Sequence, residues 1–180
     1  MNRLILLGDS IRLGYQPEVA RILNGRMEVA GPDENGRWSG YILNSLRFWM
    51  PEWGKPDVIH LNAGLWDTGD DYGFGRPFTR PADYKENLEL ILKVLRQHYP
   101  DAKMILATTT PTLDRDQQVI RNYNEILSRT AREQGIFIND LYDLFAGQEE
   151  KYICPDKVHL TKEGFSLAAE QVVHAVEHVI

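Results

Sequence analysis

Five short apolar runs alternate with longer segments of helical periodicity, and this alternation constrains the fold more than any other feature of the sequence. The runs cover residues 3–7, 26–30, 57–62, 103–109 and 136–140. Short buried strands separated by helices are typical of parallel sheets that carry helices on both faces. We therefore predict an α/β protein with one five-stranded parallel sheet.

The intervening segments show the spacing expected of helices. The clearest helical patterns cover residues 82–98, 117–134 and 162–179. In the first of these, Leu88, Leu92 and Leu95 recur at intervals of three and four, which places them on one helix face. Gly135 follows the second pattern and is typical of a residue that ends a helix.

Composition limits the partners that this chain can bind. At 180 residues, with 43% hydrophobic and 26% charged residues, the chain is expected to form one domain over residues 1–180. A net charge of -6 argues against nucleic-acid binding, which needs a basic surface. With the single cysteine Cys154, the chain can form neither an internal disulfide nor a CxxC metal cluster.

The chain also lacks the apolar segments that membrane proteins need. No run approaches the ~18 apolar residues of a membrane span. The opening apolar run reaches Gly8 too early for a signal peptide. We therefore expect a cytoplasmic protein that binds a small molecule and neither a membrane nor a nucleic acid.

Ligands of parallel sheets bind beyond the carboxyl ends of the strands, so the residues there are the candidates for a site. The first strand ends in Gly8-Asp9-Ser10. Ser10 could be a nucleophile exposed at this edge, or Asp9 or Ser10 could simply cap the following helix. The sequence contains neither the phosphate-binding pattern GxxxxGK[ST] nor the GxSxG pattern of ordinary α/β-hydrolases.

A serine nucleophile requires a base, and His159 is the best placed of the five histidines. The stretch PDKVHLTKEG, residues 155–164, puts Asp156 three residues before His159. At that spacing the carboxylate can orient the imidazole. His60 lies within a predicted strand and His98 ends a predicted helix, so we interpret both as structural.

Two further motifs resemble metal sites, and we assign neither to metal binding. HAVEH, residues 174–178, matches a zinc-protease pattern, but a zinc site needs at least three ligands, so we expect a solvent-exposed helix face. DTGDDYGFG, residues 67–75, lacks the spacing of a calcium loop. We expect this segment to be a surface loop at the rim of the site.

The GDS triplet and the D-x-x-H motif, at opposite ends of a five-strand α/β pattern, resemble the SGNH/GDSL hydrolase superfamily. The resemblance implies a three-layer α/β/α, flavodoxin-like sandwich with strand order 2-1-3-4-5. It also implies a serine esterase without metal or cofactor. Ser10 would be the nucleophile, His159 the general base and Asp156 the residue that orients it.

The resemblance further implies an oxyanion hole formed by the Ser10 N–H, a glycine after the second strand and an asparagine after the third. In NGRWSGYIL, residues 35–43, Gly40 fits this role best and Gly36 is the alternative. The third block departs from the family, because HLNAGLWD replaces G-x-N-D. Asn62 stands where the family has its first glycine, so it is either the oxyanion donor or a turn residue that ends the strand.

The stretch NAGLWD, residues 62–67, resembles a variant of this block found in carbohydrate-directed members of the superfamily. Trp66, Trp38 and Arg12 would then contact the substrate, and the alternative for the tryptophans is packing within loops. We expect short acyl groups, such as O-acetyl groups on sugars. The alternatives are a lysophospholipase or thioesterase, a non-catalytic binding module and a flavin or nucleotide binder, although the last lacks a glycine-rich phosphate loop.

Overall fold

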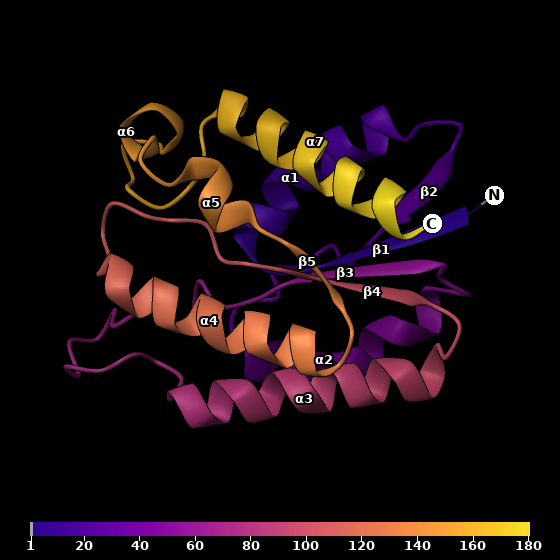
Figure 1. The fold of residues 1–180 in the computed structure, drawn as a ribbon, viewed down its shortest axis with the longest axis horizontal. Coiled ribbons are helices and arrows are strands. Elements are labelled where there is room, and N and C mark those ends of the chain that lie inside the picture. The colour runs from indigo at the N-terminus through magenta and orange to yellow at the C-terminus, as the bar shows by residue number, and fades with distance from the viewer. Residues whose placement is uncertain (1) are drawn as a thin grey trace.

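A computed structural model describes residues 2–180, and its centre is a five-stranded parallel sheet (Figure 1). The strands are β1 (Asn2–Leu7), β2 (Met27–Ala30), β3 (Val58–Asn62), β4 (Lys103–Ala107) and β5 (Phe137–Asn139). They lie in the order β2-β1-β3-β4-β5, and every neighbouring pair is parallel. The predicted sheet and its strand order are confirmed.

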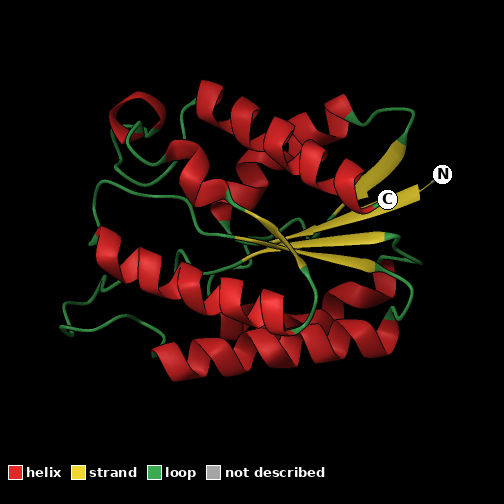
Figure 2. Ribbon diagram, in the orientation of Figure 1, coloured by secondary structure: helices red, strands yellow, loops and turns green. Residues whose placement is uncertain are grey.

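Helices cover both faces of the sheet (Figure 2). They are α1 (Ser10–Ile22), α2 (Ser39–Trp49), α3 (Pro81–His98), α4 (Gln117–Glu133), α5 (Leu141–Phe145), α6 (Glu149–Tyr152) and α7 (Lys162–Val179), with a 3-10 turn at Met50–Glu52. The helices α1, α5 and α7 lie on one face, and α2, α3 and α4 lie on the other (Figure 1). The molecule is therefore the three-layer sandwich expected from the sequence.

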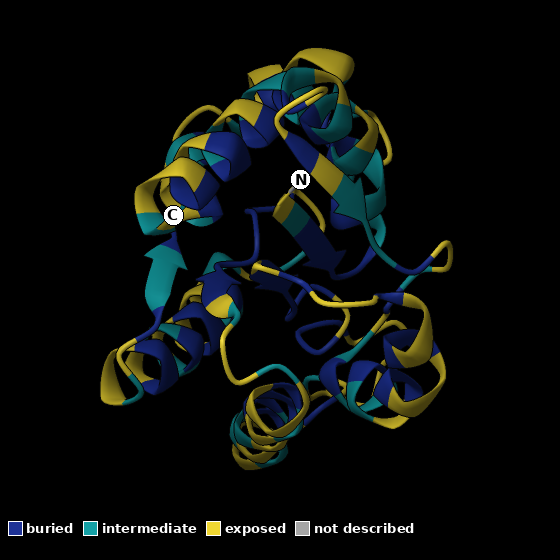
Figure 3. Cartoon of the chain, turned by 90° about the vertical axis from the view of Figure 1, so that its right-hand side faces the viewer, coloured by how far each residue is buried: buried dark blue, intermediate teal, exposed yellow. Residues whose placement is uncertain are grey.

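Two apolar cores follow from the alternation of side chains along β1. Leu4 and Leu6 pack under α1 and α7, while Ile5 and Leu7 pack against the helices of the opposite face. All four side chains are fully buried. Figure 3 shows buried residues on the helix faces that meet the sheet and exposed residues on the outer faces of the helices.

The fourth strand is shorter than the sequence predicts. β4 ends at Ala107, whereas the apolar pattern extends through Thr109. The Asn124 side chain on α4 accepts a hydrogen bond from the Thr109 N–H at 2.8 Å and donates one to its carbonyl at 2.9 Å. The Asn124 side-chain amide therefore takes the hydrogen bonds that a neighbouring strand would otherwise form with the Thr109 backbone. The chain turns away from the sheet at this point.

Among residues 2–180, no helix combines the length and the hydropathy that crossing a membrane requires. The cytoplasmic location expected from the sequence stays a prediction.

Candidate active site

The turn between β1 and α1 leaves the Ser10 side chain at the carboxyl edge of the sheet. Asp9 caps α1, because its Oδ1 accepts a hydrogen bond from the Ile11 N–H at 2.9 Å. The Ser10 hydroxyl is therefore not needed for capping. Gly8 permits the tight turn, since a Cβ there would lie 2.6 Å from the Asn62 carbonyl oxygen.

The structure brings Ser10, His159 and Asp156 together, although Ser10 and His159 are 149 residues apart in the sequence. His159 Nε2 lies 2.9 Å from Ser10 Oγ, and His159 Nδ1 lies 2.8 Å from Asp156 Oδ2. These are hydrogen-bond distances. A hydroxyl, an imidazole and a carboxylate thus form one chain of hydrogen bonds, the arrangement that activates a serine as a nucleophile.

Asp156 is held in the ionised form. Its Oδ1 accepts hydrogen bonds from the N–H groups of Val158 and His159, both at 2.9 Å. These two bonds, with the further bond from the imidazole, lower the pKa of Asp156 to about 2. A negative carboxylate next to Nδ1 keeps the proton on that nitrogen, and Nε2 then faces Ser10 as an acceptor.

The turn that carries Asp156 and His159 is tied down at both ends. The Cys154 N–H donates to the His159 carbonyl at 2.7 Å. Thr161 caps α7 through its hydroxyl, which accepts from the Gly164 N–H at 3.2 Å. The turn that carries His159 is therefore continuous with the capped start of the last helix. The side chains of His159 and Asp156 are 42% and 51% exposed, so this part of the site is open to solvent.

Two backbone N–H groups at helix N-termini can stabilise an oxyanion. Ser10 is the first residue of α1 and Gly40 is the second residue of α2. No acceptor among residues 2–180 takes either N–H, as expected for the first turn of a helix. Gly36 is not available for this role, because its N–H donates to the Gly8 carbonyl at 2.9 Å.

Asp67 is buried against the start of α2 and does not lie on the surface loop expected from the sequence. It is fully buried, and its carboxylate accepts hydrogen bonds from the Ser39 N–H and the Ser39 hydroxyl. Burial raises the pKa of Asp67, and the bonds from Ser39 oppose that effect. The prediction of a surface loop is therefore wrong at Asp67, while Asp70 and its neighbours through Arg76 are exposed.

Position 64, in the third block, is restricted to glycine for a steric reason. Gly64 has φ +139°, and a Cβ there would lie 2.3 Å from Thr109 Oγ1. An asparagine does not fit at this position. The neighbouring Ala63 carbonyl accepts a hydrogen bond from the buried Tyr84 hydroxyl at 2.7 Å, which holds the turn in place.

The Asn62 side chain does not face solvent. Asn62 is 1% exposed, and within residues 2–180 neither Nδ2 nor Oδ1 of its amide has a hydrogen-bond partner. The oxygen of the amide lies beneath the Gly8 turn. To reach an oxyanion, the amide would have to rotate out from under Gly8, so its predicted role stays a prediction.

The three predicted substrate-binding side chains differ in accessibility. Arg12 is fully buried, and its guanidinium donates to the carbonyls of Pro32 and Glu34, both at 2.7 Å. This bonding joins α1 to the loop before α2 and leaves no surface for a substrate, which corrects the expectation for Arg12. Trp38 is half-buried with its ring centroid 5.3 Å from that of Phe78, and Trp66 is 37% exposed.

The remaining histidines lie away from the triad. Burial lowers the pKa of His60 to about 4, and Asn139 Nδ2 lies 3.0 Å from its Nε2, so His60 is a neutral core residue as predicted. His178 packs against Phe137 with ring centroids 4.5 Å apart. Between residues 2 and 180, no group of three His, Cys, Asp or Glu side chains is arranged to hold a metal ion.

Solved structures similar to this chain share its whole fold. An acetyl xylan esterase, AlAXEase, superposes with TM-score 0.82 at 20% identity, covering 97% of this chain and 99% of that one. The lipase/acylhydrolase from Enterococcus faecalis gives 0.79 at 20% identity, with 99% and 97% covered. A carbohydrate esterase family 3 protein from Talaromyces cellulolyticus gives 0.76 at 20% identity, with 99% and 98% covered.

No curated protein is significantly similar to this sequence. The profile of the GDSL-like lipase/acylhydrolase family, in contrast, matches residues 6–167, which is most of the chain and includes Ser10, Asp156 and His159. The protein therefore belongs to the GDSL-like lipase/acylhydrolase family and is an ester hydrolase.

Proposed function

We propose that this protein is a serine esterase that removes short acyl groups, with O-acetyl groups on carbohydrate as the preferred substrates. The observation that carries the proposal is the bridging position of His159, 2.9 Å from Ser10 Oγ and 2.8 Å from Asp156 Oδ2. An imidazole bonded on both sides in this way can take the serine proton and return it to the leaving alcohol.

The reaction proceeds in two halves. Ser10 Oγ attacks the ester carbonyl while His159 takes its proton, and the resulting oxyanion is stabilised by the N–H groups of Ser10 and Gly40. The alcohol leaves with the proton from His159, and Ser10 carries the acyl group. Water, deprotonated by His159, then attacks this acyl-enzyme. The acid is released, and Ser10 regains its proton.

Support for a carbohydrate substrate comes from the exposed ring of Trp66 and from the similarity to structures named as acetyl xylan esterase and carbohydrate esterase. An exposed aromatic ring offers a flat apolar face against which a sugar ring can pack. His159 is 42% exposed, and an open site of this kind suits a short acyl group.

A lipid-directed lysophospholipase or thioesterase is the second candidate. The observation that favours it is the pair Tyr72 and Phe74, which are 74% and 63% exposed on the loop after β3. Exposed aromatic side chains of this kind are unusual on a solvated surface and can contact an acyl chain.

The test is hydrolysis of p-nitrophenyl acetate, butyrate and octanoate by the wild type and by Ser10→Ala. We expect the wild type to prefer acetate and Ser10→Ala to lose at least about a thousandfold in turnover. Preference for octanoate would favour the lipid-directed function. Full activity in Ser10→Ala would exclude Ser10 as the nucleophile.

A further inference from the structure

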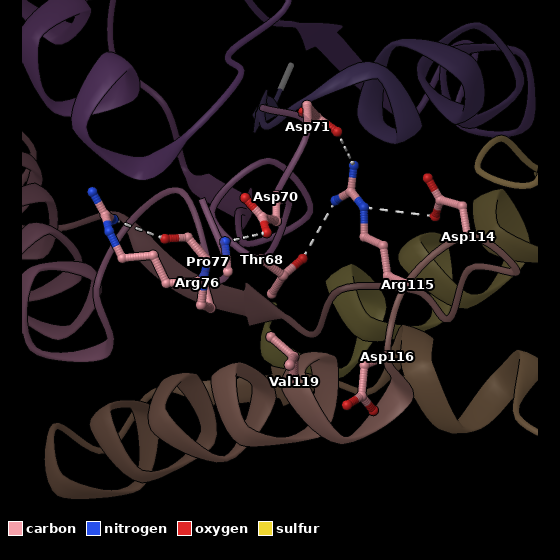
Figure 4. A pocket seen from close by; sticks show the side chains of 10 residues that line it. Thr68, Asp70, Asp71, Arg76, Pro77, Asp114, Arg115, Asp116 and Val119 are labelled. Atoms are coloured by element: carbon pink, nitrogen blue, oxygen red, sulfur yellow. Dashed lines mark hydrogen bonds and ion pairs between the residues drawn. The ribbon is translucent and has the colours of Figure 1, made fainter. Parts of the chain in front are cut away.

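A cavity of about 320 Å³ opens between the loops that follow β3 and β4 (Figure 4). Both loops lie at the carboxyl edge of the sheet, on the same side as Ser10. The side chains that line it include four carboxylates and two guanidinium groups, from Asp70, Asp71, Asp114, Asp116, Arg76 and Arg115. A volume of this size is within the range of small-molecule sites.

Arg115 sits at the centre of this cavity's polar wall, with Asp71 on one side and Asp114 on the other (Figure 4). One end of its guanidinium donates to the Leu65 carbonyl. The other nitrogens lie 4.0 Å from an Asp71 oxygen and 3.6 Å from an Asp114 oxygen, both longer than a hydrogen bond. The Arg115 side chain is only 13% exposed, so these donors have little access to bulk water.

The other charged groups are already engaged. Asp70 accepts hydrogen bonds from the N–H groups of Phe74 and Gly75, at 2.6 and 2.8 Å. Asp116 caps α4, and Arg76 turns away from Arg115 to the Pro77 carbonyl (Figure 4). By contrast, Asp71 and Asp114 accept no hydrogen bond within residues 2–180 and contact Arg115 only as ion pairs, at 4.0 and 3.6 Å.

The ion pairs of Arg115 with Asp71 and Asp114 are therefore longer than hydrogen bonds, so a hydroxyl placed among the three groups can form shorter bonds to them. An anion would be repelled by the two carboxylates, and a cation would be repelled by the guanidinium. A hydroxyl group suits both, because its oxygen accepts a hydrogen bond from Arg115 while its proton is donated to a carboxylate. A rigid ring that carries several hydroxyls could form hydrogen bonds with Arg115, Asp71 and Asp114 at the same time.

The cavity is joined to the triad by the backbone. The Leu113 N–H donates to the Lys157 carbonyl at 2.7 Å, so the loop that carries Arg115 is fastened to the turn between Asp156 and His159. Trp66 is the next residue after the backbone carbonyl that Arg115 holds.

We propose that this cavity binds hydroxyl groups on the alcohol half of the ester, a neutral sugar, through Arg115, Asp71 and Asp114. The proposal rests on the esterase function proposed above and adds the subsite that selects the alcohol.

Two acetate esters test the proposal. 6-O-acetylglucose carries free hydroxyls, and p-nitrophenyl acetate carries none. The double variant Asp71→Ala/Asp114→Ala should lose about tenfold in kcat/KM on 6-O-acetylglucose, chiefly through KM, and stay within twofold of the wild type on p-nitrophenyl acetate. Both carboxylates are partly or largely exposed, so their removal should leave the fold intact. Asp101→Ala, at the opposite edge of the sheet, is the matched control and should change neither ester.

An equal loss on both esters, or no loss on either, would overturn the proposal. A wild type without activity on p-nitrophenyl acetate would count against the esterase function itself. The subsite is then tested by binding of 6-O-acetylglucose to Ser10→Ala, followed through the NMR signals of Arg115. We expect saturable shifts in Ser10→Ala and none when the two aspartates are also removed. Identical shifts with and without the aspartates would overturn the proposal.

Discussion

Asp67 holds the first residue of α2, since its carboxylate accepts the Ser39 N–H at 3.0 Å and the Ser39 hydroxyl at 2.6 Å. The next residue is Gly40, whose N–H is a proposed oxyanion donor. Asn87 on α3 adds a hydrogen bond to the Ser39 hydroxyl at 3.0 Å. The loop after β3 thus positions the first turn of α2, which carries this donor.

Replacing Asp67 should weaken catalysis more than binding. In Asp67→Ala the start of α2 loses its anchor, and Gly40 is no longer held towards the oxyanion. We expect kcat on p-nitrophenyl acetate to fall about tenfold or more with KM nearly unchanged, because the oxyanion exists only in the transition state. Loss of the buried bonds should lower the free energy of unfolding by about 1–3 kcal/mol.

The control for Asp67 is Glu133→Ala, an exposed acidic residue at the end of α4. Urea unfolding and steady-state kinetics on the three proteins provide the readouts. A rise in KM at constant kcat would show that Asp67 does not act through the oxyanion.

Removal of the Asp156 charge should impair the base. In Asp156→Asn the imidazole loses the carboxylate that sets its tautomer, so turnover should fall by about 10²–10⁴-fold. Steady-state kinetics on p-nitrophenyl acetate measures the loss. Turnover within a few-fold of the wild type would mean that His159 is oriented by its backbone turn alone.

The pH dependence of stability at Asp156 has a defined sign. Its folded-state pKa is lowered from 3.8 to about 2, so its contribution is present above pH 4 and is lost as the pH falls towards 2. Urea midpoints of wild type and Asp156→Asn should therefore differ at pH 6 and converge only as the pH falls to about 2. A constant difference over this range would contradict the assigned shift.

The ionisation of Asp9 should have the opposite effect on folding stability from that of Asp156. Asp9 is fully buried, and burial raises its pKa from 3.8 to about 6, so the folded state is progressively destabilised as the pH rises through that interval. Asp9→Asn keeps an oxygen to cap α1 and removes the buried charge. We expect a gain of up to about 3 kcal/mol in unfolding free energy at pH 7 and almost none at pH 4.

Thermal or urea unfolding at the two pH values measures the Asp9 effect, with Asp101→Asn as an exposed comparison. Equal stability of Asp9→Asn and wild type at pH 7 would show that the charge is compensated, for example by Arg12.

Introducing an asparagine at position 64 should destabilise the protein. The Cβ of Gly64→Asn would meet Thr109 Oγ1 at 2.3 Å, and the left-handed backbone adds strain. We expect a loss of about 2–4 kcal/mol in stability and no gain in activity. Adding Thr109→Ala to Gly64→Asn should recover part of the stability, and an additive loss instead would mean that the clash is not the cause.

Local patterns in the sequence determined the elements and the two motifs. The alternation of apolar runs predicted the five strands, because a strand buried on both faces needs a continuous apolar run. The spacing of Asp156 and His159 already predicted their contact, since three residues in one turn bring a carboxylate to an imidazole. The cap on α1 by Asp9 was one of the alternatives that the GDS triplet allowed.

Only the tertiary structure decided which distant groups meet. It brought Ser10 within hydrogen-bond distance of His159 and buried Arg12 under the loop before α2. It also made the Asp67 carboxylate the hydrogen-bond acceptor of Ser39. In the folded chain the Gly36 N–H donates to the Gly8 carbonyl, whereas the Gly40 N–H has no acceptor within residues 2–180. These outcomes depend on contacts between loops far apart in the chain, and such contacts leave no periodic or local signal in the sequence.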